Sequence, residues 1–97
     1  IELRKLELAR AMAARPRLLI SDEAIAGLSS AEVDEILAIL TALNERGISI
    51  IMIEHIMRAV MRFSHRIIVL DAGRTIAEGT PEEILHNTAV ETAYLGE

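Results

Sequence analysis

The sequence predicts an α/β layered fold, in which flanking helices cover a mostly parallel sheet of about three strands that continues into a short hairpin. Two apolar segments carry this prediction, residues 18–23 (LLISDE) and residues 50–55 (IIMIEH), and each runs into ionisable side chains. A helical pattern separates them, and strands that alternate with helices favour a parallel sheet. Because parallel strands end at one edge of a sheet, we expect a functional site where these two segments end.

The first half of the chain carries clear helix and strand signals. Residues 3–14 are rich in Ala, Leu, Arg and Glu and predict a helix that Pro16 stops. Residues 18–21 predict a short buried strand. Ser29 and Glu32 have the spacing of a capping box, which opens a second helix. That helix places five apolar residues on one stripe: Val33, Ile36, Leu37, Leu40 and Leu43.

The second half continues the alternation of strands and helices. Gly47 stands where a residue with a left-handed backbone ends the second helix. Residues 48–53 are apolar on both faces apart from Ser49, which predicts a central strand covered by helices on both sides. The remaining elements are, in order, a helix near residues 56–63, a strand at 67–70, a turn at 71–74, a short strand at 75–78, a helix opened by Thr80-Pro81-Glu82-Glu83 and a last helix near 88–91.

The composition indicates one small domain whose own chain does not cover all of its apolar surface. Hydrophobic residues make up 52% of the 97 residues and aromatic residues only 2%, so the core is built from aliphatic side chains. A mean hydropathy of +0.35 is high for a domain of this size. We therefore expect a partner or a further length of chain to cover part of the surface.

Charge and cysteine content exclude several classes of protein. A net charge of −5 argues against a nucleic-acid partner, and the absence of cysteine excludes disulfides and thiolate chemistry. No apolar segment approaches the ~20 residues that a membrane span needs. The amino terminus is not a signal peptide and carries no Met, so we expect the chain to begin inside a longer protein.

Asp22, Glu23 and His55 are the candidate site residues. A carboxylate at the end of a buried strand can hold Mg²⁺, which prefers oxygen ligands, and an adjacent carboxylate can activate a water for attack on a phosphoryl group. An Asp-Glu pair after an apolar segment also begins many surface turns, and a lone His is more often structural. Their occurrence at the ends of successive strands favours the functional interpretation.

Seven motifs occur in the order found in one protein family. They are residues 5–11 (KLELARA), residues 18–23, Ala26-Gly27-Leu28-Ser29, residues 51–55, residues 67–79, Thr80-Pro81-Glu82-Glu83-Ile84 and Tyr94-Leu95-Gly96-Glu97. In turn they resemble the helix after the signature motif, the Walker B strand, the D-loop, the switch-histidine strand, a hairpin, its following helix and the terminal tail of ATP-binding-cassette (ABC) transporter ATPase subunits. The chain most resembles the carboxy-terminal part of the subunits of branched-chain amino-acid importers, which implies a partial P-loop NTPase-like fold.

The resemblance implies a role for each candidate residue. Asp22 would serve the Mg²⁺ of bound ATP, Glu23 would be the general base for the attacking water, and His55 would contact the γ-phosphate. The D-loop would communicate across a dimer of ATPase subunits through Ala26, Gly27, Leu28 and Ser29. The implied cofactors are ATP and Mg²⁺, and the implied partners are transmembrane permease subunits and a second ATPase subunit. The implied location is cytoplasmic, peripheral to the inner face of the cell membrane.

Several motifs of that family do not occur in these 97 residues. The phosphate loop G-x-x-x-x-G-K-[ST], the glutamine-bearing loop and the end of the signature motif are missing, and Ala24 stands where the family usually has Pro. In the family, the phosphate-loop strand lies between the strands at 50–53 and 67–70, so we expect an incomplete sheet. Residues 1–97 are then expected to be a single partial domain that binds neither ATP nor Mg²⁺ and is inactive alone.

Three functions are compatible with these observations. The leading hypothesis is part of an ATPase subunit that powers amino-acid import. The second is a degenerate, non-catalytic α/β remnant that self-associates. The third is an independent Mg²⁺-dependent phosphohydrolase that uses Asp22, Glu23 and His55. We also expect the isolated chain to self-associate, because unpaired apolar strand edges are templates for association.

Overall fold

The computed structural model describes residues 1–95, which divide into two compact units. The first unit comprises residues Ile1–Ala59 and the second begins at Val60. Helix α3 (Met57–Phe63) carries the chain from one unit to the next. No helix among the described residues is both long enough and apolar enough to cross a membrane.

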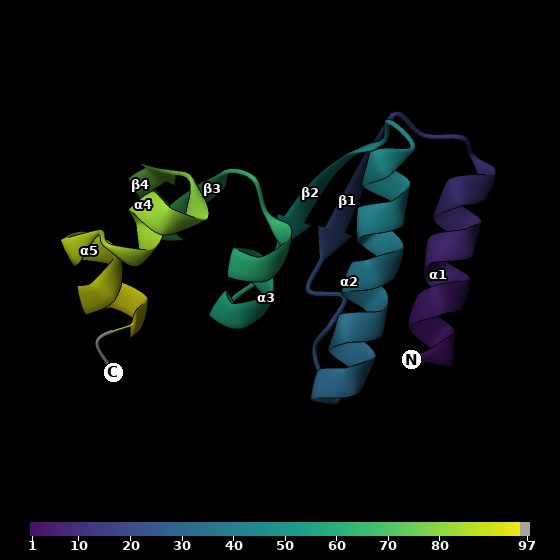
Figure 1. The fold of residues 1–97 in the computed structure, drawn as a ribbon, viewed down its shortest axis with the longest axis horizontal. Coiled ribbons are helices and arrows are strands. Elements are labelled where there is room, and N and C mark those ends of the chain that lie inside the picture. Colours follow the sequence, from purple (N-terminus) through teal and green to yellow (C-terminus); the bar gives the residue numbers. More distant parts are fainter. Residues whose placement is uncertain (96–97) are drawn as a thin grey trace. The chain divides into compact units, whose positions relative to one another are not determined.

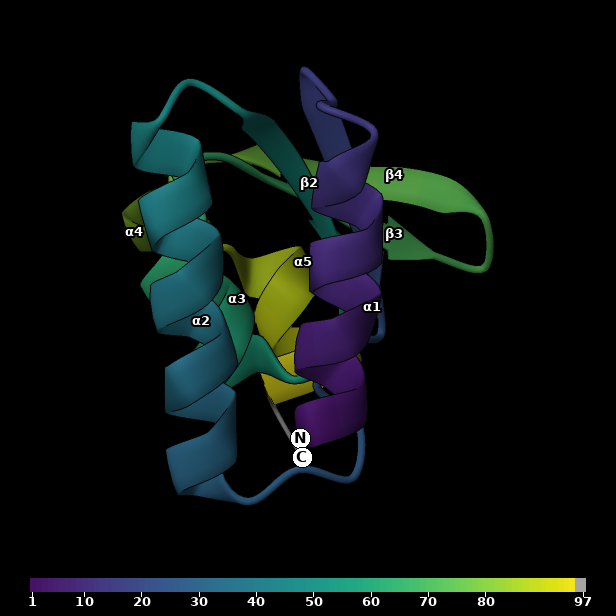
Figure 2. The same ribbon diagram turned by 90° about the vertical axis from the view of Figure 1, so that its right-hand side faces the viewer.

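The first unit contains two helices and a pair of parallel strands. Its elements are α1 (Glu2–Ala13), β1 (Leu18–Asp22), α2 (Ser30–Glu45) and β2 (Ser49–Ile53). Strands β1 and β2 pair in parallel, with Leu19 opposite Ile50 and Asp22 opposite Ile53. Figures 1 and 2 show α1 and α2 running alongside one another in the same direction, and Figure 1 shows both strands running the opposite way. The predicted β-α-β unit is therefore confirmed.

Local signals explain where α2 begins and ends. The Ser29 hydroxyl accepts a hydrogen bond from the Glu32 amide at 3.2 Å, and the Glu32 carboxylate accepts one from the Ser29 amide at 3.0 Å, which confirms the predicted capping box. At the other end Gly47 has a φ of +97°, the left-handed conformation that glycine adopts without strain. Four of the five stripe residues are buried in the core: Val33, Ile36, Leu37 and Leu40. The fifth, Leu43, is half-buried.

Only one face of the parallel pair is covered. In β1 the side chains of Leu19 and Ser21 are buried, whereas Leu18 and Ile20 are exposed. In β2, Ile50 and Met52 are half-buried. The opposite face carries an exposed apolar patch formed by Leu18, Ile20, Ile51 and Ile53. The expectation that helices cover both faces of residues 48–53 is wrong for residues 1–95, because the face of β2 that carries Ile51 and Ile53 is exposed.

The second unit is built on an antiparallel hairpin. Strands β3 (Ile67–Asp71) and β4 (Arg74–Gly79) are joined by Ala72 and Gly73, which have φ values of 50° and 78°. Two residues with positive φ between antiparallel strands are typical of a tight hairpin turn. The unit continues through α4 (Pro81–Leu85), α5 (Thr88–Val90) and a short π-helix η1 (Glu91–Leu95).

The second unit encloses its own small core. Its buried members are Val60, Ile67, Val69, Ile84 and Val90. Thr80 caps α4 in the predicted capping box, with Pro81 in the first turn. The Tyr94 hydroxyl donates a hydrogen bond to the Leu70 carbonyl. Gly96 and Glu97, the last two residues of the predicted tail motif, lie outside the described residues.

The α/β class is confirmed, but the sheet differs in detail from the expected one. Within residues 1–95, the strands form two two-stranded sheets, β1–β2 and β3–β4. The parallel part therefore contains two strands rather than about three. The third predicted strand, at residues 67–70, pairs with β4 instead of with the parallel strands. A turn of only two residues joins it to β4 and brings the two strands together.

Candidate functional site

The carboxyl ends of β1 and β2 bring together residues that are thirty-two positions apart in the sequence. Asp22 is the last residue of β1 and Glu23 follows it directly. The parallel register ends β2 at the same edge, opposite Asp22, so that His55 lies beside Glu23. The distance between His55 Nδ1 and Glu23 Oε1 is 3.3 Å, and both side chains are open to solvent, at 67% and 59% exposure. This geometry allows a carboxylate and an imidazole to act on one group.

The backbone at Glu23 is held in an uncommon conformation. Its φ is 52°, in the left-handed region that non-glycine residues avoid. The Glu23 amide donates a hydrogen bond to the Ile53 carbonyl at 2.9 Å, which extends the β1–β2 ladder by one step. Left-handed non-glycine residues concentrate at functional sites, where surrounding contacts keep the strained conformation.

The D-loop-like turn begins immediately after Glu23. Ala26 donates to the Glu23 carbonyl at 3.4 Å, and Leu28 donates to the Ile25 carbonyl at 3.2 Å, so the chain reverses tightly before α2. Gly27 has a φ of +78°, which glycine accommodates without strain. Of the four candidate contact residues, Ala26, Gly27 and Ser29 are exposed and Leu28 is half-buried. This turn therefore presents an accessible surface next to Glu23.

Glu54 contacts the turn that follows Glu23, and the sequence pattern predicts no role for it. Its Oε2 accepts a hydrogen bond from the Ile25 amide at 3.4 Å. Its Oε1 is buried and has no hydrogen-bond partner among the described residues. The one feature of the sequence that could have pointed to Glu54 is its position between an apolar strand and His55.

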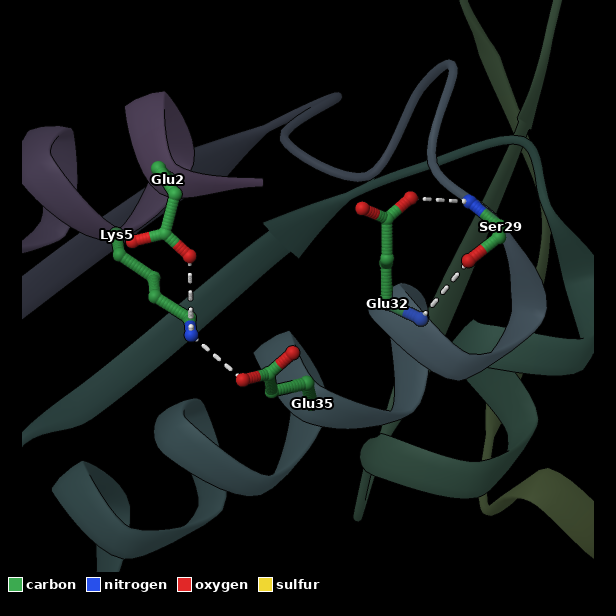
Figure 3. A network of polar contacts seen from close by, with 5 residues as sticks. All are labelled: Glu2, Lys5, Ser29, Glu32 and Glu35. Carbon is green, nitrogen blue, oxygen red and sulfur yellow. Dashed lines mark hydrogen bonds and ion pairs between the residues drawn. The ribbon is translucent and has the colours of Figure 1, made fainter.

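Figure 3 shows two groups of polar contacts, one that joins Glu2 and Lys5 of α1 to Glu35 of α2 and one between Ser29 and Glu32 at the start of α2. The Lys5 ammonium donates to Glu35 Oε1 at 2.5 Å and lies 3.6 Å from Glu2 Oε1. The hydrogen bond to Glu35 raises the pKa of Lys5 above its ordinary value, and Glu2 adds to the effect. In the capping box, hydrogen bonds from the Ser29 amide and then the Ser29 hydroxyl lower the pKa of Glu32. These contacts connect α1 to α2 and fix the start of α2.

The described residues offer few of the ligands that a metal ion needs. No group of three or more His, Asp or Glu side chains among them could hold a metal ion. Mg²⁺, however, is commonly held by one or two carboxylates together with substrate phosphates and waters. The exposed Asp22 carboxylate at the end of β1 is suited to be such a carboxylate ligand.

A pocket of about 150 Å³ lies between α1 and β1, with Ser21 and Asp22 in its lining. Pockets that enclose small-molecule ligands usually measure about 300–1,000 Å³. This pocket is therefore too small to enclose a nucleotide.

Comparisons with known proteins find relatives over nearly the whole chain. A family model described as "Branched-chain amino acid ATP-binding cassette transporter" matches residues 74–97. The chain is 45% identical over 95 residues to the high-affinity branched-chain amino acid transport ATP-binding protein BraF of Pseudomonas aeruginosa, covering 97% of this chain and 37% of BraF. It is also 45% identical over 97 residues to LivG of Escherichia coli K12, a protein described in the same words, again covering 97% of this chain and 37% of the relative. The lipopolysaccharide export system ATP-binding protein LptB of Haemophilus influenzae is 38% identical over 96 residues, which are 99% of this chain and 40% of LptB.

Solved structures agree with these relatives. The ADP conformation of MJ1267, an ATP-binding cassette of an ABC transporter, matches with a TM-score of 0.86 and 28% identity over 97% of this chain and 39% of that chain. A nucleotide-free ATP-binding cassette from an ABC transporter matches with a TM-score of 0.88 and 27% identity over 99% of this chain and 40% of that chain. The chain thus spans about two fifths of the length of the proteins that it matches. Its sequence corresponds to the carboxy-terminal part of an ABC transporter ATP-binding domain, with branched-chain amino acid transport ATP-binding proteins among its homologues.

Proposed function

We propose that residues 1–97 are the carboxy-terminal part of one ATPase domain, which hydrolyses ATP to power the import of branched-chain amino acids. The observation that carries the proposal is the 3.3 Å contact between Glu23 and His55 at the common edge of β1 and β2. The names of BraF and LivG support the substrate class. In this proposal the two units belong to a single partial domain.

Glu23 is the proposed general base. Its carboxylate is exposed, so a water can reach it and lose a proton to it as the water attacks a phosphoryl group. Asp22, one residue earlier, would hold Mg²⁺ together with the phosphates of ATP, and bound Mg²⁺ neutralises charge that develops on the transferred group. The two neighbouring carboxylates thus take different roles, as metal ligand and as base.

His55 is the proposed contact to the γ-phosphate. Its Nδ1 faces the Glu23 carboxylate, so Nε2 is the nitrogen left to face a phosphate oxygen, to which it donates when it carries a proton. An imidazole in this place orients both the base and the group that is attacked. The geometry therefore favours joint action of Glu23 and His55 over a purely structural role for the histidine.

The proposed partners follow from the surface beside the site. Ala26, Gly27, Leu28 and Ser29 form the accessible turn that would contact a second ATPase subunit. Transmembrane permease subunits would couple hydrolysis to transport, which places the domain on the cytoplasmic face of the cell membrane. A solved relative from Clostridium perfringens, cbiO1, is described as part of the ABC transporter complex cbiONQ, so this class of protein includes members of larger assemblies.

The isolated chain is proposed to bind neither ATP nor Mg²⁺ tightly and to hydrolyse no ATP. In phosphoryl-transfer sites of this kind, the amides and Lys of a phosphate loop make the principal contacts to the β- and γ-phosphates, and these 97 residues contain no such loop. Calorimetric titration with ATP and Mg²⁺ tests this. Heat of binding at micromolar ligand would instead support the independent phosphohydrolase.

The second candidate function, a non-catalytic chain that self-associates, rests on the exposed apolar patch of Leu18, Ile20, Ile51 and Ile53. Such a patch on a strand pair with open edges favours association. Light scattering on the isolated chain is expected to give the mass of a dimer or a larger oligomer of the 10.7 kDa chain. A single species at 10.7 kDa at high concentration would contradict self-association.

The import function is tested with a hybrid of E. coli LivG in which these residues replace the LivG segment that they match. In cells without LivG, the hybrid is expected to restore high-affinity leucine uptake, and its Glu23→Gln variant is expected to fail. A folded hybrid that hydrolyses ATP but restores no uptake would overturn the proposed transport role. A folded hybrid that does not hydrolyse ATP would overturn the proposed catalytic role.

A further inference from the structure

Three consecutive residues at the end of β2 each contact the segment that carries Glu23. We propose that the middle one, Glu54, is a positioning residue: its carboxylate holds the turn that follows Glu23, and so fixes where the Glu23 carboxylate lies against His55. This inference rests on the proposed function for the meaning of Glu23, but the contact that it concerns is independent of ATP.

The contacts form a short, continuous series. The Ile53 carbonyl accepts from the Glu23 amide at 2.9 Å, Glu54 Oε2 accepts from the Ile25 amide at 3.4 Å, and His55 Nδ1 lies 3.3 Å from Glu23 Oε1. Glu23 is therefore held from both sides. Its own amide is fixed by the strand, and the residue two places later is fixed by Glu54.

The conformation of Glu23 explains why a second point of attachment matters. With a φ of 52° the residue is sterically disfavoured, and it relaxes unless the flanking chain is restrained. The Ile25 side chain is 1% exposed and anchors the turn in the core. Glu54 adds a directional restraint on the Ile25 backbone that packing alone does not give.

The burial of Glu54 argues against a role in stability alone. Its Oε1 is buried and unpaired within the part of the chain that the structure describes. A buried polar atom without a partner costs free energy that an apolar side chain of similar size would not. A carboxylate at this position therefore makes better sense as an acceptor for the Ile25 amide than as a packing residue.

Two substitutions separate the hydrogen bond from the packing. Glu54→Gln keeps an acceptor for the Ile25 amide, whereas Glu54→Leu keeps a similar volume without one. Glu45→Leu, at an exposed position in the last turn of α2, is the matched control for replacing a carboxylate by Leu.

Amide hydrogen exchange and backbone chemical shifts, measured by NMR on the 97-residue chain, give the first readout. In Glu54→Leu the Ile25 amide is expected to exchange about tenfold faster or more, and the Glu23 shifts are expected to move, while exchange in the middle of α2 is unchanged. Glu54→Gln and Glu45→Leu are expected to match the wild-type chain. Unchanged exchange at Ile25 in Glu54→Leu, an equal increase throughout the core, or a Gln variant that behaves like the Leu variant would each overturn the positioning role.

The LivG hybrid gives the second readout. Glu54→Leu is expected to lower kcat for ATP hydrolysis at least tenfold with an unchanged KM, and Glu54→Gln is expected to restore most of it. A rise in KM with an unchanged kcat would overturn the proposal. If the hybrid with Glu54 intact hydrolyses no ATP, the proposed function fails, and the exchange experiment still decides the positioning role.

Discussion

In each of the two strand pairs, the first strand is followed by a non-glycine residue with a left-handed backbone. The two residues lead into different kinds of turn. Glu23 follows β1 with a φ of 52°, and Ala72 follows β3 with a φ of 50°. Ala72 is followed by Gly73, and together they close an antiparallel hairpin, a turn that requires positive φ at both positions. Glu23 closes no hairpin. It leads into a turn that puts its carboxylate beside His55.

Under the proposed function, the same backbone feature serves structure at Ala72 and chemistry at Glu23. At Ala72 any residue that tolerates positive φ would serve, and Gly or Asn would serve better. At Glu23 the carboxylate itself is needed for the proposed reaction, so relieving the strain with Gly would remove the function. Each unit encloses a buried apolar core, and each also leaves apolar strand residues exposed, Ile20 and Ile51 in the first unit and Ile68 and Leu70 in the second.

The largest expected effect tests whether the closed core supports the hairpin of the second unit. Ile84 is 1% exposed, and Ile84→Ala is expected to lower the free energy of unfolding by about 2–5 kcal/mol because it leaves a cavity. Chemical denaturation, followed by circular dichroism, measures the change. The neighbouring Leu85→Ala, at a side chain that is 49% exposed, is the control and is expected to change little. Equal losses in both variants would contradict the closed core.

The next effect compares the helix starts of the two units. Ser29→Ala and Thr80→Ala each remove a capping hydroxyl, and each is expected to cost about 1 kcal/mol of stability. The loss at Ser29 should also increase hydrogen exchange at the start of α2, and the loss at Thr80 should do so at the start of α4. A variant with unchanged exchange at its own helix start would show that packing alone fixes that helix.

The same capping boxes predict a dependence of stability on pH. Hydrogen bonds from the Ser29 and Thr80 amides, followed by those from the hydroxyls, lower the pKa values of Glu32 and Glu83 below 4.5. Because the folded pKa lies below the unfolded one, this stabilisation is fully present above pH 4.5 and is lost as the pH falls through the folded pKa. Urea midpoints measured across this range should fall less steeply in the double variant Glu32→Gln, Glu83→Gln. An unchanged acid slope would exclude these two carboxylates as its source.

The smallest expected effect tests the opening comparison itself. Ala72→Gly and Glu23→Gly each relieve a left-handed non-glycine residue, and each is expected to raise stability by about 0.5–1 kcal/mol. Thermal denaturation of the two variants gives the values. Destabilisation by Glu23→Gly would mean that the Glu23 side chain contributes more to folding than its strained backbone costs.

The order of helices and strands could be predicted from local signals, but the coverage of the strands could not. The capping boxes at Ser29 and Thr80 act within four residues, so the sequence alone locates these helix starts. Residues 48–53 are apolar on both faces, yet which face is covered depends on the helices that the folded chain supplies. The pairing partner of the strand at 67–70 likewise depends on which other strands lie near it in the folded chain.

The sequence predicted that Glu23 and His55 would lie at one edge of the sheet, but not which contacts hold them there. The two strand ends pointed to Asp22, Glu23 and His55, because parallel strands end at one edge. The left-handed backbone of Glu23 and the contact between Glu54 and the Ile25 amide arise only when the turn is closed in three dimensions. A carboxylate that accepts from a backbone amide twenty-nine residues away leaves no local pattern in a sequence.

The most direct test of the central claim, that Glu23 is the general base, is phosphate release by the purified LivG hybrid with Glu23 intact and with Glu23→Gln. The amide keeps the shape of the side chain but cannot accept a proton, so kcat is expected to fall by a factor of about 10²–10⁴ while ATP binding, measured in parallel, stays intact. Undiminished hydrolysis by the Glu23→Gln hybrid would contradict the account.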